Sequence, residues 1–184
     1  MRITLLRHGK PDFDWERNVS GSEFKRLESA YDLAGIVGSP TAESRKLLDF
    51  HEVIVCSDLP RSIQSAKALG AGEIHYSSAL FREMNLPYFD REPITLPLRL
   101  WALVLRTLWF MGFSKNTESI FTARGRAKVA ARTLVELAGE HESVLLVGHG
   151  FLNHYVAKEL LAQDWVGPSS PGRKYWEYGT YERA

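Results

Sequence analysis

Residues 5–10, LLRHGK, bring an apolar run to an abrupt end in an arginine, a histidine and a glycine. Residues 3–6 are continuously apolar or β-branched, a pattern typical of a short strand that is covered on both faces in a parallel sheet. The packing of a buried strand does not require cationic side chains at its end. The arrangement therefore points to a role for Arg7 and His8 beyond packing.

Two further apolar runs end in a similar way. Residues 53–56 (VIVC) are followed by SDLPRS, which contains Arg61, and residues 144–147 (VLLV) are followed by GHG, which contains His149. In open α/β sheets, ligands bind in the crevice beyond the carboxyl ends of the strands. If the three strands are parallel, the two arginines and the two histidines converge on one pocket.

Helical patterns fill the gaps between these runs. We expect helices at about residues 41–48, 60–69, 117–138 and 151–161, and Asn116 or Thr117 is the expected cap of the long one. Residues 74–76 are a candidate fourth strand, and residues 175–181 are a candidate C-terminal edge strand. This alternation of strands and helices predicts an α/β fold with three layers and a mostly parallel sheet.

The length of 184 residues suits one domain. We expect residues 1–184 to form a single domain with a lid or insertion at about residues 81–116.

The apolar segment 93–113 is nearly long enough to span a membrane, but Arg99 and Arg106 interrupt it, and each would cost about 2.5–3.5 kcal/mol in the bilayer. They lie seven residues apart, hence on one helical face. The segment is therefore predicted to be a buried or lid helix with one edge exposed to solvent. A membrane-surface or dimer-forming helix is the alternative.

The charge balance limits the range of partners. The chain has 23 Lys and Arg against 22 Asp and Glu, a net charge of +1, which lacks the basic surplus of nucleic-acid binders. The basic helix face at residues 124–132 is accordingly expected to be solvated.

The single cysteine, Cys56, cannot form an internal disulfide and fits a reducing compartment. With no signal-peptide pattern at the N-terminus, we expect a cytoplasmic protein without a nucleic-acid partner.

Two arginines and two histidines are suited to bind an anion. Arginine presents a planar fork of donors that matches phosphate oxygens, and Gly9 and Gly150 would allow the backbone to approach a ligand closely. The helices that begin near Pro60 and Phe151 would direct their positive N-termini at the same pocket. The sequence thus predicts a phosphate site, although it contains no P-loop signature.

Histidine is the natural attacking group in such a pocket, because the sequence offers no G-x-S-x-G serine and Cys56 lies inside an apolar run. A neutral imidazole is nucleophilic at one nitrogen when the other donates its proton to a backbone carbonyl. Neighbouring arginines disfavour the imidazolium form. Attack on phosphorus would give a phosphohistidine, which water then hydrolyses.

A leaving alkoxide also needs a proton, and the stretch SSALFREMNLP offers Glu83 for this purpose. A carboxyl group beside a phosphate is driven toward its protonated form by like charge, which suits it to general acid catalysis. His154 follows His149 by five residues rather than the four of a zinc-binding helix. We therefore expect no metal and interpret His154 as a helix-surface or supporting residue.

The stretches LLRHG, SDLPRSIQSA, LFREMNLP and VLLVGHG, in this order, resemble the histidine phosphatase superfamily, which includes cofactor-dependent phosphoglycerate mutases. The match extends from residue 5 to about residue 150. The resemblance implies an α/β/α sandwich with a mostly parallel central sheet, and neither a metal nor another cofactor. It also implies that His8 is the phosphorylated nucleophile, that Glu83 is the proton donor, and that the phosphoryl group is bound by Arg7, Arg61 and His149.

Some positions depart from the family pattern. Lys10 and Pro11 follow the RHG motif in place of the usual Glu-Thr, and Asp14 occupies the position of an asparagine. The chain is also too short for the extra segments of the mutase branch, so we expect a phosphatase. Ser20, in NVSG, lies where the mutase branch has a substrate-contacting Ser-Gly and is a further candidate for substrate contact.

The expected reaction is hydrolysis of a phosphomonoester, or of a phosphohistidine, and the expected partner is a small phosphorylated molecule or a phosphoprotein. Two alternatives stay open. One is phosphoryl transfer of the phosphoglycerate mutase type. The other is a non-catalytic phosphate-recognition module at a membrane surface. The sequence indicates neither the natural substrate nor an oligomeric state.

Overall fold

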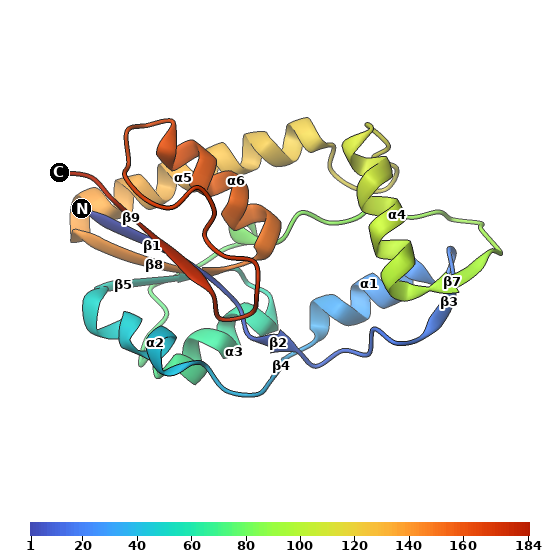
Figure 1. The fold of residues 1–184 in the computed structure, drawn as a ribbon, viewed down its shortest axis with the longest axis horizontal. Helices are drawn as coiled ribbons and strands as arrows, with labels where there is room; N and C mark the ends of the chain where they lie inside the picture. Colours follow the sequence, from blue (N-terminus) through green and yellow to red (C-terminus); the bar gives the residue numbers. More distant parts are fainter.

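The computed structural model describes residues 1–184, and its centre is a five-stranded sheet with the order β6-β5-β8-β1-β9 (Figure 1). The first four strands run parallel to one another, and β9 is antiparallel to β1 at the edge. The predicted mostly parallel sheet is therefore confirmed. The strands are β1 (Arg2–Arg7), β5 (Val53–Cys56), β6 (Tyr76–Ser77), β8 (Ser143–Gly148) and β9 (Tyr178–Glu182).

Helices cover both faces of this sheet, with α5 and α6 on one face and α2 and α3 on the other (Figure 1). The expected α/β/α sandwich is thus confirmed. The helices are α2 (Ala42–Arg45), continued by a 3-10 helix (Lys46–Phe50), α3 (Pro60–Leu69), α5 (Ile120–His141) and α6 (Gly150–Leu161).

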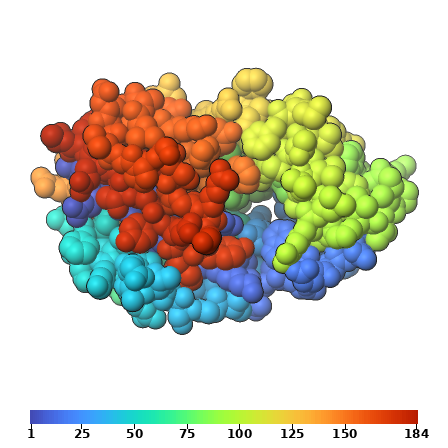
Figure 2. Space-filling model, viewed as in Figure 1, coloured from blue at the N-terminus to red at the C-terminus, as the bar shows by residue number.

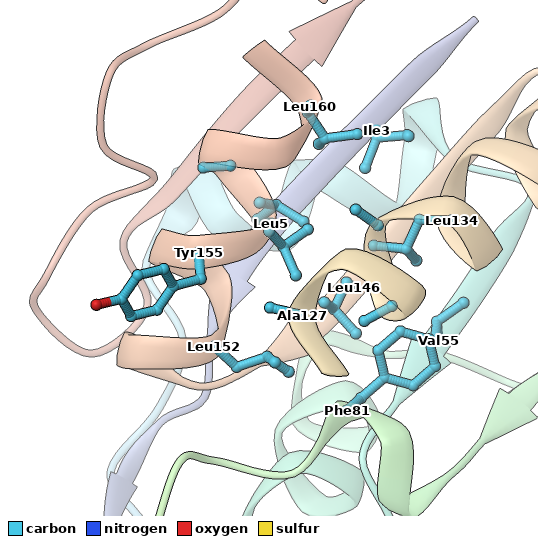
Figure 3. Close-up of a cluster of buried hydrophobic side chains, with 14 of the residues drawn as sticks. Ile3, Leu5, Val55, Phe81, Ala127, Leu134, Leu146, Leu152, Tyr155 and Leu160 are labelled. Atoms are coloured by element: carbon cyan, nitrogen blue, oxygen red, sulfur yellow. The ribbon is translucent and has the colours of Figure 1, made fainter. Parts of the chain in front are cut away.

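The central strands are buried on both faces, which explains why their sequences are continuously apolar. Ile3 and Leu5 of β1 join Leu134 of α5 in the larger core cluster (Figure 3). Leu6 of the same strand joins Leu69 of α3 in a second cluster on the other face. Because residues 3–6 of β1 are buried on both faces, the polar groups that follow the strand are placed at the end of the sheet.

A third cluster lies beyond the carboxyl ends of the parallel strands, where α1 and α4 pack with a two-stranded ribbon (Figure 1). Trp101 of α4 is at its centre and donates its indole N–H to the backbone carbonyl of Val19 at 3.0 Å. This contact ties α4 to the N-terminal half of the chain. The elements are α1 (Phe24–Leu33), α4 (Leu98–Phe110) and the ribbon β3 (Asn18–Ser20) with β7 (Thr95–Pro97), and a separate short ladder joins β2 (Lys10–Pro11) to β4 (Ile36–Val37).

The two arginines of α4 have different surroundings. Arg99 is exposed and pairs with Glu16, whereas Arg106 is partly buried and donates from Nη2 to the backbone carbonyl of Met84 at 2.7 Å. The prediction that both arginines lie on one solvent-exposed edge of the helix is therefore wrong, because Arg106 has a backbone carbonyl acceptor inside the protein. No helix of the structure has both the length and the apolar character that crossing a membrane requires.

Several short elements gave no clear signal in the sequence, among them α1 and the strands β2, β3, β4 and β7. α1 buries only Phe24 and Leu27, so few apolar residues mark it in the sequence. The long helix α5 begins later than predicted: Ser119 is its cap, in place of Asn116 or Thr117, and accepts a hydrogen bond from the N–H of Thr122 at 3.1 Å. The fourth strand, β6, begins two residues and ends one residue later than predicted.

The C-terminal segment returns to the end of β1. The N–H of Trp176 donates to the carbonyl of Arg7 at 3.1 Å, and the N–H of Arg7 donates to the carbonyl of Glu177 at 2.9 Å. The Trp176 ring then packs directly on Gly9, where an added Cβ would lie 2.8 Å from Cε2 of that ring. Glycine is needed at this position because the indole occupies the space that a side chain would take.

Replacing Gly9 with alanine should therefore destabilise the fold by about 1–3 kcal/mol, the usual cost of overpacking. Gly139→Ala is the matched control, because Gly139 lies within α5 and its added Cβ would meet nothing within 4 Å. This control should leave stability unchanged or raise it by up to about 1 kcal/mol. Urea unfolding of both variants measures the difference, and equal effects would contradict the packing argument.

Candidate active site

His8 lies directly after β1 and is only 2 % exposed. Its Nδ1 is 2.7 Å from the carbonyl oxygen of Gly9, so Nδ1 carries the proton and donates it, and Nε2 keeps its lone pair. Burial, with a smaller contribution from Arg61 and Arg7, lowers the pKa of His8 to about 3. The imidazole is thus uncharged at neutral pH. Its contribution to stability is complete above about pH 6.5 and is lost as the pH falls toward 3.

His149 lies directly after β8 and is fully buried. The parallel register of β1 and β8 brings its ring centroid to 5.0 Å from that of His8. Its Nε2 lies 2.7 Å from Oγ of Ser57, and its Nδ1 has no partner. Burial, followed by the neighbouring His8 and arginines, holds the pKa of His149 well below its ordinary value. Both histidines are therefore neutral, which allows two imidazoles to lie together in a dry site.

Arg61, in the first turn of α3, is 1 % exposed although it carries a charge. Its Nη1 donates to the carbonyl of Tyr31 at 2.8 Å, and its Nη2 is 3.2 Å from Oδ1 of Asp32. The guanidinium also lies 4.3 Å from the centre of the Tyr31 ring. Residues of α1 therefore compensate the buried charge, and an incoming phosphate would compete with Asp32 for it.

Arg7, the last residue of β1, is held by the C-terminal segment. Its guanidinium lies 4.5 Å from the centre of the Tyr175 ring, and Nη1 donates to the carbonyl of Arg173. Its Nε is buried without a partner. Each site arginine thus has one face against a tyrosine ring, which leaves the edge and the other face for an anion.

Glu83 reaches the N-terminus of α6, where its carboxylate accepts hydrogen bonds from the N–H of Phe151 at 3.1 Å and of Leu152 at 3.0 Å. A Cβ added at Gly150 would lie 3.7 Å from Oε2 of Glu83 and 3.5 Å from Nε of Arg7, so carboxylate and guanidinium approach the same glycine. The positive end of α6, which we expected to face the ligand, is occupied by this carboxylate.

Arg126 of α5 fixes the loop that carries Glu83. Its guanidinium donates to the carbonyls of Leu80 at 3.0 Å, Arg82 at 2.7 Å and Glu83 at 3.2 Å, and it pairs with Glu118. The prediction that the basic face of this helix is solvated is therefore wrong at this position. A basic run in a helix gives no indication that one of its arginines will bind the carbonyls of a distant loop.

A cavity of about 670 Å³ opens between the C-terminal segment, α4 and the N-terminal residues (Figure 2). Arg7, Arg61 and Glu83 line it, whereas His8 and His149 are buried and are not among the residues that line it. The structure does not contain a cluster of three or more His, Cys, Asp or Glu side chains that could hold a metal ion.

Ser20 does not line the cavity and lies apart from the other candidates. It lies on β3, where its Oγ donates to Oε2 of Glu23 at 2.7 Å, so it caps the start of α1. His154, interpreted as a surface or supporting residue, lines the cavity.

Four residues of the site were not found from the sequence: Tyr31, Asp32, Arg173 and Tyr175. They come from α1 and from the C-terminal segment, two parts of the chain without a recognisable motif. The alternation of aromatic and charged residues near the C-terminus was the available signal, and we interpreted it as an edge strand.

A comparison with protein-family models matches residues 3–171 to the model described as "Histidine phosphatase superfamily (branch 1)". None of the curated protein sequences matches the chain at a significant level.

Solved structures share the fold at low sequence identity. The product of the open reading frame Rv3214 from Mycobacterium tuberculosis is 20 % identical, with a TM-score of 0.63 over 97 % of this chain and 89 % of that one. The mycobacterial glucosyl-3-phosphoglycerate phosphatase Rv2419c is also 20 % identical, with a TM-score of 0.60 over 97 % and 88 %. A phosphoserine phosphatase from Entamoeba histolytica is 16 % identical, with a TM-score of 0.55 over 88 % and 80 %.

The contacts of Arg126 predict a combined loss of stability and activity in Arg126→Met, which keeps the bulk of the side chain but removes its donors. Three carbonyls would lose a partner, at a cost of about 1–3 kcal/mol for a buried unpaired group, and Glu83 would lose its support. Arg132→Met is the matched control, because Arg132 is exposed on the same helix, and it should change stability by no more than about 0.5 kcal/mol. Urea unfolding and phosphatase assays of both variants test this. If the two behave alike, Arg126 does not position the loop.

Proposed function

The chain belongs to the histidine phosphatase superfamily, and on this premise we propose that it hydrolyses a phosphomonoester, or a phosphohistidine, through a covalent phosphohistidine on His8. The observation that supports this best is the 2.7 Å contact between Nδ1 of His8 and the carbonyl of Gly9, in a buried imidazole flanked by Arg7 and Arg61. This contact orients the ring and keeps Nε2 unprotonated, as a nucleophile requires.

In the proposed first step, Nε2 of His8 attacks phosphorus, and the bond between phosphorus and the ester oxygen breaks as the N–P bond forms. Arg7 and Arg61 bind the non-bridging oxygens through charge-assisted hydrogen bonds. For Arg61, the phosphoryl oxygens take over from the carboxylate of Asp32, the acceptor present in the structure. The arginines supply the positive charge that transfer needs, so the proposed reaction is independent of metal ions.

Glu83 is proposed to give a proton to the leaving alkoxide and to regain one in the second step. There, water attacks the phosphohistidine, its proton passes to Glu83, and the N–P bond breaks to release inorganic phosphate and neutral His8. Two backbone N–H groups of α6 hold the carboxylate in place during both steps. In this proposal Glu83 enters the first step as the carboxylic acid.

The proposed substrate is a small phosphorylated molecule, in line with the relatives of known name, which include phosphatases of glucosyl-3-phosphoglycerate and of phosphoserine. We also propose that residues 81–116 act as the lid of the domain. This proposal is supported by the position of α4 beside the cavity, which Leu98, Leu103 and Phe110 line.

The His8→Ala variant should lose at least about 10³-fold in hydrolysis of p-nitrophenyl phosphate, because no other nucleophile stands in its place. His141→Ala, which changes an exposed histidine at the end of α5, is the control and should keep full activity. Rapid quenching of the wild type should also trap acid-labile, base-stable phosphate on His8. Unreduced turnover of His8→Ala would refute the mechanism, and a wild type that binds phosphate but neither turns over nor becomes labelled would be a recognition module.

Glu83→Gln should slow formation of the phosphoenzyme by about 10²–10⁴-fold for alkyl phosphates, whose leaving alkoxides need a proton. Phosphorylation by p-nitrophenyl phosphate should slow far less, because nitrophenolate leaves without protonation. A single-turnover measurement isolates this step from the later attack of water. Equal slowing with both esters would exclude Glu83 as the general acid.

A further inference from the structure

The cavity continues from the two arginines along a wall that is largely apolar. Fourteen of the 26 residues that line it are hydrophobic. They come chiefly from α1, from the loop before α1 and from α4, which face each other across the opening. The apolar side chains that line this wall include Phe24, Leu27, Met84, Leu98, Leu103 and Phe110.

Some of the polar atoms on this wall already have partners, whereas Nη1 of Arg106 is buried without one. Arg106 donates from Nη2 to the carbonyl of Met84, and its guanidinium lies 4.2 Å from the centre of the Phe151 ring and 4.9 Å from that of Trp109. Glu28 accepts a hydrogen bond from the N–H of Leu86 at 3.3 Å. A ligand rich in hydroxyl groups would therefore lose more hydrogen bonds to water on entering this space than the wall replaces.

Apart from Arg106, the wall carries little charge near neutral pH. Burial, with the nearby Asp32, raises the pKa of Glu28 to about 7, so this carboxyl is uncharged in a large share of molecules. The full charges of Arg7 and Arg61 stay at the phosphate end. The cavity thus divides into a cationic end for the phosphoryl group and a weakly polar remainder for the leaving group.

The apolar wall extends to the outside of the protein. Leu103 is 64 % exposed and Phe110 is 49 % exposed, although both line the cavity. They lie seven residues apart on α4, hence on one face of the helix. Exposed apolar residues that continue an apolar cavity indicate a surface meant to be covered, and a leaving group that reaches the opening would cover them.

We propose that the substrate is the monophosphate of an apolar alcohol, alkyl or aryl, whose hydrocarbon part lies along α1 and α4 and extends to Leu103 and Phe110. This inference rests on the proposed function, because it places the phosphoryl group at Arg7 and Arg61. It differs from that proposal in naming the leaving group. Sugar phosphates of similar size are expected to be poor substrates, since the wall offers their hydroxyl groups few free partners.

An alkyl series tests this directly. Ethyl, butyl, hexyl and octyl phosphate share the same ester chemistry, so differences in kcat/KM report contacts of the chain. Burial of one methylene contributes about 0.8 kcal/mol, or about fourfold, so kcat/KM should rise by up to about that factor per methylene until the chain reaches the opening. In the aryl arm, 1-naphthyl phosphate should exceed phenyl phosphate, and glucose 6-phosphate should fall below hexyl phosphate.

Leu103→Gln should flatten the rise between butyl and octyl phosphate. Leu100→Gln is the matched control: Leu100 is 42 % exposed on the same helix but does not line the cavity, so this variant should keep the wild-type rise. Equal slopes in the two variants would mean that the chain does not lie along this part of α4, and the placement would be wrong.

Alkylphosphonates, which cannot be hydrolysed, separate a failure of this inference from a failure of the proposed function. Calorimetry should show that their affinity increases with chain length, whether or not the protein is a phosphatase. Hydrolysis of ethyl phosphate and of sugar phosphates with no rise along the alkyl series would overturn the apolar substrate and leave the phosphatase in place. Chain-dependent binding of phosphonates without turnover of any ester would overturn the phosphatase and keep the apolar site.

Discussion

The parallel pairing of β1 with β8 sets Arg7 opposite Gly148, and this register puts His8 and His149 next to each other just past the sheet. Two imidazoles can lie 5.0 Å apart in a buried site only if they are uncharged, and burial itself lowers the pKa of both. The main features of the site follow from this constraint. The histidines are neutral, so Nε2 of His8 is a free base, and all the positive charge is left to the arginines.

Those arginines are kept in place by neighbouring groups, and a phosphate would displace one of them, the carboxylate of Asp32. Arg61 is buried yet ion-paired with Asp32, and removal of the ion-pair partner of a buried charge is costly. Its partner therefore has to be exchanged for another anion rather than simply lost. The tyrosines that stack on Arg7 and Arg61 leave the other face of each guanidinium to an anion. These contacts thus hold the site in an arrangement that suits an anion.

The position of Glu83 depends on contacts from two helices. The N–H groups at the start of α6 bind its carboxylate, and Arg126 of α5 binds the carbonyls of its loop. The groups around phosphorus are accordingly supported by the sheet and its flanking helices, while the leaving-group side of the cavity is built from α1 and α4. The two sides are nevertheless connected, because Trp109 of α4 belongs to the central core and α1 supplies Tyr31 and Asp32 to Arg61.

The sequence alone determined the parallel sheet, because a strand buried on both faces must be apolar at consecutive positions, as in VIVC and VLLV. It also located His8, Arg61 and His149, since polar groups after such strands share one edge of the sheet. Only the tertiary structure decided the partners of these groups: Asp32, Tyr175 and Arg126 come from segments whose local pattern carries no motif. It likewise removed Ser20 from the cavity and turned Arg106 inward. A strand pattern is a local property of the chain, whereas the partner of a buried charge depends on which distant segment packs against it, and no short stretch of sequence records that.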